Sequence, residues 1–180
     1  VQLVWIGAES QRVVFPKRQN QGLRELIEEL QRHGISVIVS SILFLDHHDR
    51  ASLWEDIHWA IDLGADLNQF MELTPAPGTP LYGQYQREGR LIPFSTTTMT
   101  GQGSLIFRHP HFRPEEGEAI TRRAFQLKYL RHGPGVLAMA RTALRGYATA
   151  VVEGAERIRA GRGWNPGTLR YDGPASGRDA

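Results

Sequence analysis

The sequence predicts an α/β fold built on a parallel sheet, and three features support that prediction. Three apolar runs alternate with two segments of helical periodicity. Each run ends in polar or turn-forming residues. The order strand, helix, strand, helix, strand is typical of parallel βαβ units with right-handed crossovers. Ligands in such sheets bind beyond the carboxyl ends of the strands.

The first predicted unit begins with a strand at residues 2–6, which is apolar almost throughout, as in a strand that is buried on both faces. Gly7 permits a tight exit from it. Residues 11–22 include Pro16, Asn20 and Gly22 and predict a loop and the start of a helix. A helix is expected from Leu23 to His33, because its apolar residues recur at positions i, i+3, i+4 and i+7 (Leu23, Leu26, Ile27 and Leu30).

The second unit has the strongest strand signal, over residues 35–45, where β-branched residues are densest. Ser52 is expected to cap the helix that follows, with Glu55 completing a capping box. The buried face of that helix is predicted from its apolar spacing (Leu53, Ile57, Ala60 and Ile61). The third strand, over residues 66–73, runs into a turn-rich segment with three prolines, residues 74–82.

The remaining chain predicts a mainly helical extension, over residues 83–160. Residues 83–113 lack clear periodicity, whereas residues 114–131 and 136–159 predict two helices. Residues 161–180 contain five glycines and few large apolar side chains, so a disordered tail is expected there.

Composition excludes several classes of protein. The chain has no cysteine, so it forms no disulfide, thiolate zinc site or cysteine-ligated iron–sulfur cluster by itself. The net charge is only +2 and no long block of like charge occurs, which argues against a nucleic-acid partner. No apolar run is long enough to span a membrane. We expect a cytoplasmic protein.

Polar residues at the three strand ends form the candidate site. They are Glu9 and Ser10, then residues 46–49, then Glu72 and Thr74. A carboxylate such as that of Glu9 can accept bonds from two ribose hydroxyls, and Ser10 can bond a carboxylate or ribose oxygen. The simpler alternative is that Glu9 pairs with Arg12 or a nearby lysine and that Ser10 caps a helix. The tryptophans are expected in the core (Trp5, Trp54 and Trp59).

Seven histidines raise the alternative of a metal site. His47 and His48 are adjacent, and neighbours in a strand point to opposite faces, which is poor spacing for a metal. His109 and His111 can share a face. No established metal motif contains either pair. Residues 46–49 could still line a pocket as acid–base groups, or they could be solvated loop residues.

Three of these motifs, taken together, resemble the second half of the radical SAM core domain. The segment 5–10, WIGAES, is similar to the G-x-E-S strand of that superfamily. Residues 33–37, HGISV, resemble its next strand, and residues 73–82, LTPAPGTPLY, closely resemble the end of its last barrel strand. Residues 40–48 and the following Trp-Glu-Asp-Ile helix look most like the subgroup that carries a cobalamin-binding domain. Residues 83–180 resemble the C-terminal extension of that subgroup.

The resemblance implies a partial (βα) barrel of three parallel βα units over residues 1–82. Glu9 and Ser10 would then help to hold the ribose and methionine parts of S-adenosylmethionine, and Ser41 and Ile42 would lie near the adenine. The cluster-binding cysteines of the family belong to its first half, which this chain lacks. S-adenosylmethionine would bind here in part, whereas the [4Fe–4S] cluster and cobalamin would belong to the full-length protein.

The resulting interpretation is a fragment of a radical SAM enzyme, inactive alone, whose partner is the missing N-terminal half of the barrel. Its reaction on a small-molecule substrate would be methyl transfer or ring or C–C bond formation. Two alternatives stay open: a non-catalytic interaction or ligand-binding module, and a metal-dependent hydrolase that uses the histidines. An uncovered first strand also predicts that the chain alone self-associates.

Overall fold

The computed structural model of this 180-residue chain describes residues 2–12, 22–94, 101–159, 163–165 and 170–172. Over these residues the α/β prediction is confirmed. One parallel sheet has the order β1 (Leu3–Glu9), β2 (Ser36–Leu43) and β3 (Leu67–Glu72). Five helices are present, at α1 (Leu23–Arg32), α2 (Arg50–Asp62), α3 (Pro80–Arg87), α4 (Glu116–His132) and α5 (Gly135–Arg159).

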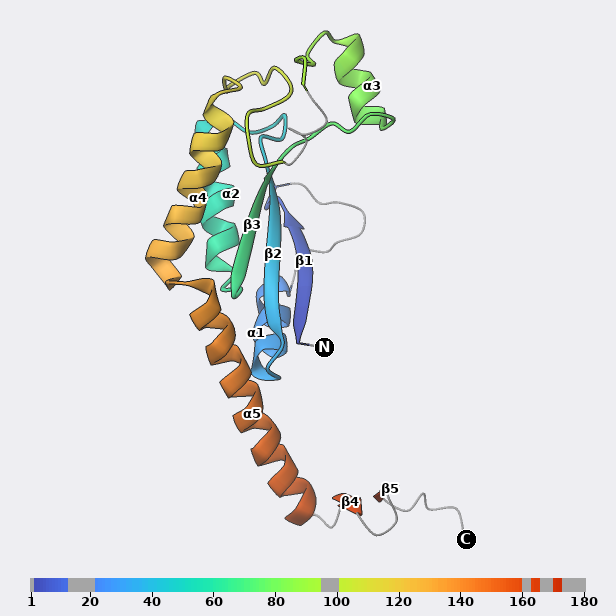
Figure 1. Ribbon diagram of the computed structural model, residues 1–180, viewed down its shortest axis with the longest axis vertical. Helices are drawn as coiled ribbons and strands as arrows, with labels where there is room; N and C mark the ends of the chain where they lie inside the picture. The colour runs from blue at the N-terminus through green and yellow to red at the C-terminus, as the bar shows by residue number, and fades with distance from the viewer. Residues whose placement is uncertain (1, 13–21, 95–100, 160–162, 166–169, 173–180) are drawn as a thin grey trace.

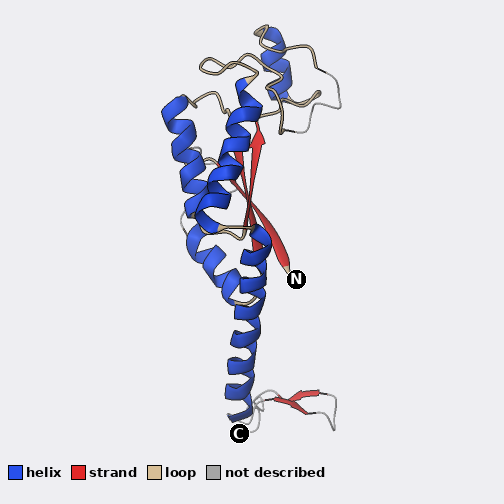
Figure 2. Cartoon of the chain, turned by 60° about the vertical axis from the view of Figure 1, so that its left-hand side comes forward, coloured by secondary structure: helices blue, strands red, loops and turns tan. Residues whose placement is uncertain are grey.

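Helices α1, α2, α4 and α5 lie on one face of the sheet, whereas α3 lies beyond the carboxyl ends of the strands (Figures 1 and 2). On this covered face, Val37 and Val39 pack against α1, and Leu43 and Phe70 pack in a cluster with α2. The alternate residues of β2, such as Ile38, are only partly buried because no described helix lies over them. We call this second side the open face.

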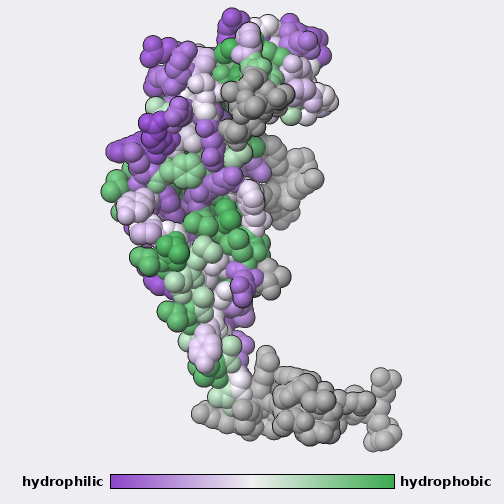
Figure 3. Space-filling view, viewed as in Figure 1, coloured by the Kyte–Doolittle hydropathy of each residue, from purple (hydrophilic) through white to green (hydrophobic). Residues whose placement is uncertain are grey.

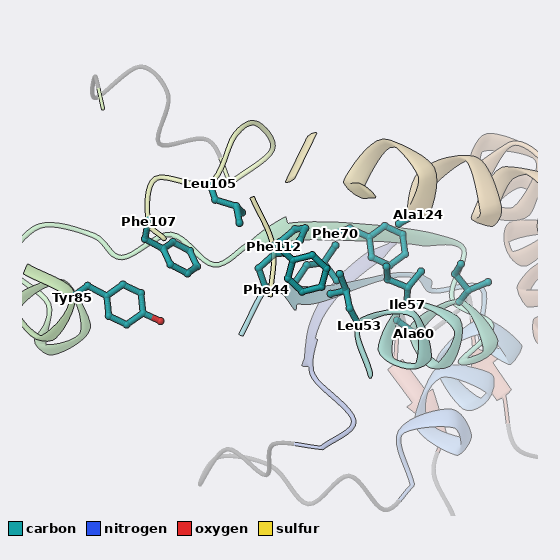
Figure 4. Packing of buried hydrophobic residues seen from close by; sticks show 12 residues of the cluster. Phe44, Leu53, Ile57, Ala60, Phe70, Tyr85, Leu105, Phe107, Phe112 and Ala124 are labelled. Atoms are coloured by element: carbon teal, nitrogen blue, oxygen red, sulfur yellow. The ribbon is translucent and has the colours of Figure 1, made fainter. Parts of the chain in front are cut away.

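The largest buried cluster lies between the sheet, α2, α4 and the segment before α4 (Figure 4). Aromatic rings pack edge to face in and beside it. Phe44 meets Phe112 edge to face with centroids 5.2 Å apart, and Phe70 meets Phe125 at 5.3 Å. The predicted buried face of α2 is confirmed, since Leu53, Ile57, Ala60 and Ile61 are all inaccessible to solvent.

Helix α5 packs against α1, and its Gly146 meets Gly34 in the turn that follows α1. A Cβ atom on Gly146 would overlap the backbone of Gly34, so only glycine permits this close approach. Beyond this contact α5 extends past the sheet (Figure 1), and hydrophobic surface lies along it in Figure 3. The exposed large apolar residues of α5 include Leu144, Val151 and Val152.

Three sequence predictions about local structure are wrong. Asp49 rather than Ser52 caps α2: its carboxylate accepts from the Ser52 backbone at 2.8 Å, and the Ser52 hydroxyl accepts from the Asp49 backbone at 2.9 Å. Residues 80–87 form α3, which was not predicted; Thr79 caps it and Pro80 starts it. Trp5 is 61% exposed, because it lies on the open face of β1.

The end of the chain contributes a small antiparallel pair, β4 (Gly163–Asn165) and β5 (Arg170–Asp172). The other residues of the predicted tail at 161–180 lie outside the described residues. None of the described helices has the length and apolar character that crossing a membrane requires.

Candidate functional site

A pocket of about 370 Å³ lies on the open face near the carboxyl ends of all three strands. We call it the strand-end pocket. Strand residues make most of its wall, and the segment that precedes α4 contributes one residue. Its lining is Trp5, Glu9, Ser40, Ser41, Ile42, Gln69, Met71, Glu72, Leu73, Thr74 and Gly101.

The strand register arranges the open face of this pocket in rows. Gly7 pairs with Ser40, and Ser40 pairs with Gln69, so these three positions form a polar row across the sheet. An apolar row lies on either side of it: Trp5, Ile38 and Leu67 towards the amino ends, and Ile42 and Met71 towards the carboxyl ends. A ligand lying here would meet polar groups between two hydrophobic bands.

Glu9 completes the polar row by folding back over β1. Its φ of 58° is in the left-handed region, at a point where the register of β1 shifts. A Cβ atom at Gly7 would lie 2.5 Å from Glu9 Oε1 and 3.8 Å from Ser40 Oγ. The glycine therefore leaves the space that the carboxylate occupies, which gives a physical reason for the Gly-x-Glu spacing.

Gln69 provides a second acceptor in the row. Its Oε1 is buried and has no hydrogen-bond partner among the described residues. Since a buried polar atom usually has a partner, this oxygen suits a ligand that donates a hydrogen bond, such as an amino or hydroxyl group. The sequence did not predict Gln69, Ser40 and Gly101 as site residues. The strand register and the loop before α4 bring them into the same pocket as Glu9.

Ser41 and Ile42 line the strand-end pocket from β2. Ile42 alternates onto the open face. Ser41 alternates with Val39 and Leu43 and is 1% exposed, so its side chain belongs to the covered face. Its hydroxyl has no partner among the described residues.

Ser10 lies outside the strand-end pocket, on the other side of the chain from Glu9. Its hydroxyl accepts from the Arg12 backbone at 3.2 Å and also bonds the carboxylate of Asp56 on α2. The His47 ring is 3.5 Å away. Of the four residues expected to bind the cofactor, three therefore line one pocket and Ser10 does not.

Glu72 closes the carboxyl end of β3. Its carboxylate accepts from Gly103 N at 3.0 Å and from the Thr121 hydroxyl at 3.2 Å. Burial raises its pKa above the usual 4.5, and these two bonds oppose the rise. Because protein donors hold it, Glu72 shapes the wall of the pocket and ties α4 to it.

The remaining strand-end acid, Asp46, serves the α3 region instead. Arg90 binds it through both terminal nitrogens, at 2.5 and 3.1 Å, and the Tyr85 hydroxyl donates to it at 2.8 Å. The Arg90 hydrogen bond is the main reason that the pKa of Asp46 is lowered. The strand-end polar residues thus divide between the pocket and the structural network around Arg90.

His48 and His109 both form hydrogen bonds with the backbone of Leu45 and so fix the turn after β2. His48 Nδ1 accepts from Leu45 N at 3.0 Å, so its Nε2 carries the proton and donates to Asp56 at 3.0 Å. His109 Nε2 donates to the Leu45 carbonyl at 3.0 Å, and its Nδ1 accepts from His111 N. Both nitrogens of each ring are used within the fold.

One group of potential metal ligands occurs among the described residues. His47, His48 and Asp56 place three ligand atoms within 4.8 Å of one another. The rings of His47 and His48 lie 4.4 Å apart in a turn, so the strand geometry expected for this pair does not apply. A metal ion at His48 Nε2 would displace the proton that bonds Asp56, which weighs against such a site.

No protein-family model matches the chain, and a search of curated proteins finds no significant match.

Proposed function

We propose that this chain is the C-terminal half of a radical SAM-type (βα) barrel and that the strand-end pocket holds part of S-adenosylmethionine. The observation that carries the proposal is the Glu9 carboxylate, folded over Gly7 into the polar row of the open face. In a barrel this face would be the interior, and helices would cover the outside, as they do here.

The pocket offers chemistry that suits a nucleoside. Glu9 would accept bonds from ribose hydroxyls, and Gln69 Oε1 would accept from a ligand amino or hydroxyl group. Ile42, Met71 and Trp5 supply apolar surface on either side of the polar row. Ser41 would contribute wall rather than a hydroxyl contact. Ser10 would act indirectly, by fixing the residues after β1 against α2.

The [4Fe–4S] cluster does not fit this chain, which has no cysteine. Its ligands, and any cobalamin-binding domain, would belong to the N-terminal half of the parent enzyme. That half would also supply a strand for the outer edge of β1, which pairs only with β2 among the described residues. The reaction we propose for the complete enzyme is methyl transfer or ring or C–C bond formation on a small molecule in the cytoplasm.

The gene sequence upstream of Val1 tests this proposal. We expect an in-frame stretch that encodes three closely spaced cysteines at the end of a βα unit. The longer protein, purified without oxygen, should then form 5′-deoxyadenosine from S-adenosylmethionine, and Glu9→Gln should reduce that activity. A start codon directly upstream would contradict the enzyme proposal and favour a ligand-binding module.

The histidine cluster supports a second, metal-dependent candidate only through its ligand spacing. Metal analysis of the purified chain tests it separately. Stoichiometric zinc, manganese or iron that is lost in Asp56→Asn would support a hydrolytic metal centre. A chain free of these metals would exclude it.

A further inference from the structure

A second pocket, of about 260 Å³, lies at the opposite end of the sheet from the strand-end pocket. We call it the basic pocket. Gln31 of α1, the turn that leads into β3, the last turn of α4 and the first half of α5 enclose it. Its lining is Gln31, Gly64, Ala65, Asp66, Lys128, Arg131, His132, Ala138, Arg141, Thr142 and Arg145.

Positive charge dominates this lining. Lys128, Arg131, Arg141 and Arg145 carry fixed or nearly fixed positive charge, and Asp66 is the single carboxylate among the lining residues. Burial and the cations Lys128, Arg131 and Arg141 lower the pKa of His132, which keeps that ring neutral at pH 7. The pocket therefore has an excess of positive charge.

Asp66 forms the floor of the pocket, and its negative charge offsets part of that excess by favouring the charged form of Lys128. It is buried, and its oxygens accept from Val37 N at 2.9 Å, Gln31 Nε2 at 3.1 Å and the Thr142 hydroxyl at 2.6 Å. These bonds join β2, α1 and α5. The carboxylate makes no ion pair with a lining cation among the described residues.

Lys128 is the deepest of the cations. It is 8% exposed, and its ammonium donates to the Ala65 carbonyl at 2.6 Å. An ammonium has three N–H donors, so two remain for a ligand. Burial lowers its pKa to about 8, which leaves the group charged at neutral pH but destabilised by desolvation. A bound anion would offset that cost.

Arg141 and Arg145 form the mouth of the pocket. They stand four residues apart on α5 and so share one side of the helix. Neither forms an ion pair with a described residue, whereas Arg131 pairs with Asp62 and Arg122 pairs with Glu118. Two like charges at this spacing destabilise a helix by themselves, and an anion between them would reverse the effect.

We propose that the basic pocket binds the phosphate or diphosphate group of a small molecule, with Lys128, Arg141 and Arg145 as the contacts. Guanidinium groups match phosphate oxygens with two parallel hydrogen bonds, and the lysine adds a point charge. The pocket is smaller than the range of about 300–1,000 Å³ that holds drug-sized ligands, so it suits a phosphate group better than a whole nucleotide. The proposal is independent of the function proposed for the strand-end pocket.

Isothermal titration of the purified chain with inorganic pyrophosphate tests the proposal. We expect saturable binding of one pyrophosphate per chain. The double variant R141Q/R145Q should weaken pyrophosphate binding by at least about tenfold, because a hydrogen bond between charged groups contributes more free energy than one between neutral groups. Both side chains are exposed and form no ion pair with a described residue, and Arg141 donates only a 3.4 Å bond to the Leu137 carbonyl of its own helix, so the variant keeps its fold.

The matched control is R24Q/R123Q, which removes the same charge from two other exposed arginines outside the pocket. It should change the affinity by less than about twofold. Equal loss in both double variants would show general attraction to a basic protein and would overturn the proposal, as would the absence of saturable binding. Lys128→Met, checked for its fold by circular dichroism, should also bind weakly; a folded variant with full affinity would remove Lys128 from the site.

A single-stranded oligonucleotide distinguishes the source of the phosphate. If the pocket recognises a small molecule, pyrophosphate should displace any bound oligonucleotide. The displacement should occur at pyrophosphate concentrations near the dissociation constant of pyrophosphate itself. Oligonucleotide binding that exceeds pyrophosphate binding and depends on Arg24 and Arg123 as much as on Arg141 and Arg145 would contradict the proposal.

Discussion

The two faces of the sheet differ in what their side chains do. On the covered face, Val37, Val39 and Phe70 are inaccessible to solvent and pack against helices. On the open face, the same strands carry Trp5, which is 61% exposed, and a polar row that no described helix covers. The covered face therefore holds the fold together, whereas the open face is the side on which we propose that a ligand and the rest of a barrel lie.

The largest expected effect separates the two faces by stability. Phe70→Ala should lower the free energy of unfolding by about 3–5 kcal/mol, because it leaves a cavity in the main core. Trp5→Ala, a change of similar size on the open face, should cost less than about 1 kcal/mol. Urea denaturation measures both. Equal losses would mean that the open face is buried in solution.

A smaller loss of stability is expected when a polar side chain is substituted on either side of the sheet. Asp56→Ala should cost about 2–3 kcal/mol, because the buried His48 N–H and the Ser10 hydroxyl lose their acceptor. Glu9→Gln on the open face should change stability by less than about 0.5 kcal/mol. Thermal unfolding of the two variants beside the wild type checks this ranking. A larger loss for Glu9→Gln would assign Glu9 a structural role.

A pH-dependent effect is expected at Glu72, where the pocket wall meets the covered core. Burial raises its pKa, so above pH 4.5 the folded chain keeps a proton that the unfolded chain releases. The free energy of unfolding should therefore fall as the pH rises from 4.5 through the raised pKa. Glu72→Gln removes this slope.

Urea titrations of wild type and Glu72→Gln at about pH 4.5 and about pH 7.5 measure the difference. The variant should gain stability relative to the wild type at the higher pH. Parallel behaviour of the two chains would show that Glu72 titrates like an exposed glutamate. Glu25→Gln, on the exposed side of α1, is the control for removal of a carboxyl group.

A substitution at the exposed Trp5 of β1 should have the smallest effect on stability and the largest effect on self-association. The outer edge of β1 carries Leu3 and Trp5, both exposed, and predicts self-association of the chain. Trp5→Lys should shift the chain towards monomer in sedimentation velocity without loss of stability, because a charge discourages edge pairing. A wild-type chain that is monomeric at all concentrations would argue that the open face needs no barrel partner.

The sequence predicted the elements better than the site. Apolar runs located the three strands, and helical spacing located α1, α2, α4 and α5. The same pattern placed Trp5 in the core, since an apolar strand does not reveal which of its faces is covered. The short helix α3 was missed because residues 74–82 read as a proline-rich turn and residues 83–87 show no clear apolar period.

The site depended on geometry that spacing does not show. Because Glu9 and Ser10 are adjacent, both were predicted to contact the same ligand. The left-handed backbone of Glu9 and the register shift of β1 instead place their side chains on opposite sides of the chain. Gln69 is one residue of the predicted third strand, and only the strand register makes it part of the polar row. The roles of His48 and His109 follow from backbone partners far along the chain.

The binding of S-adenosylmethionine to the chain, measured by saturation-transfer NMR, tests the central claim most directly. The claim predicts weak, saturable binding with contacts to the adenosine protons, and Glu9→Gln should weaken it about tenfold or more through loss of charged hydrogen bonds. Glu25→Gln should bind like the wild type. Equal affinity of the Glu9→Gln variant and the wild type would contradict the assignment of the strand-end pocket as the nucleoside site.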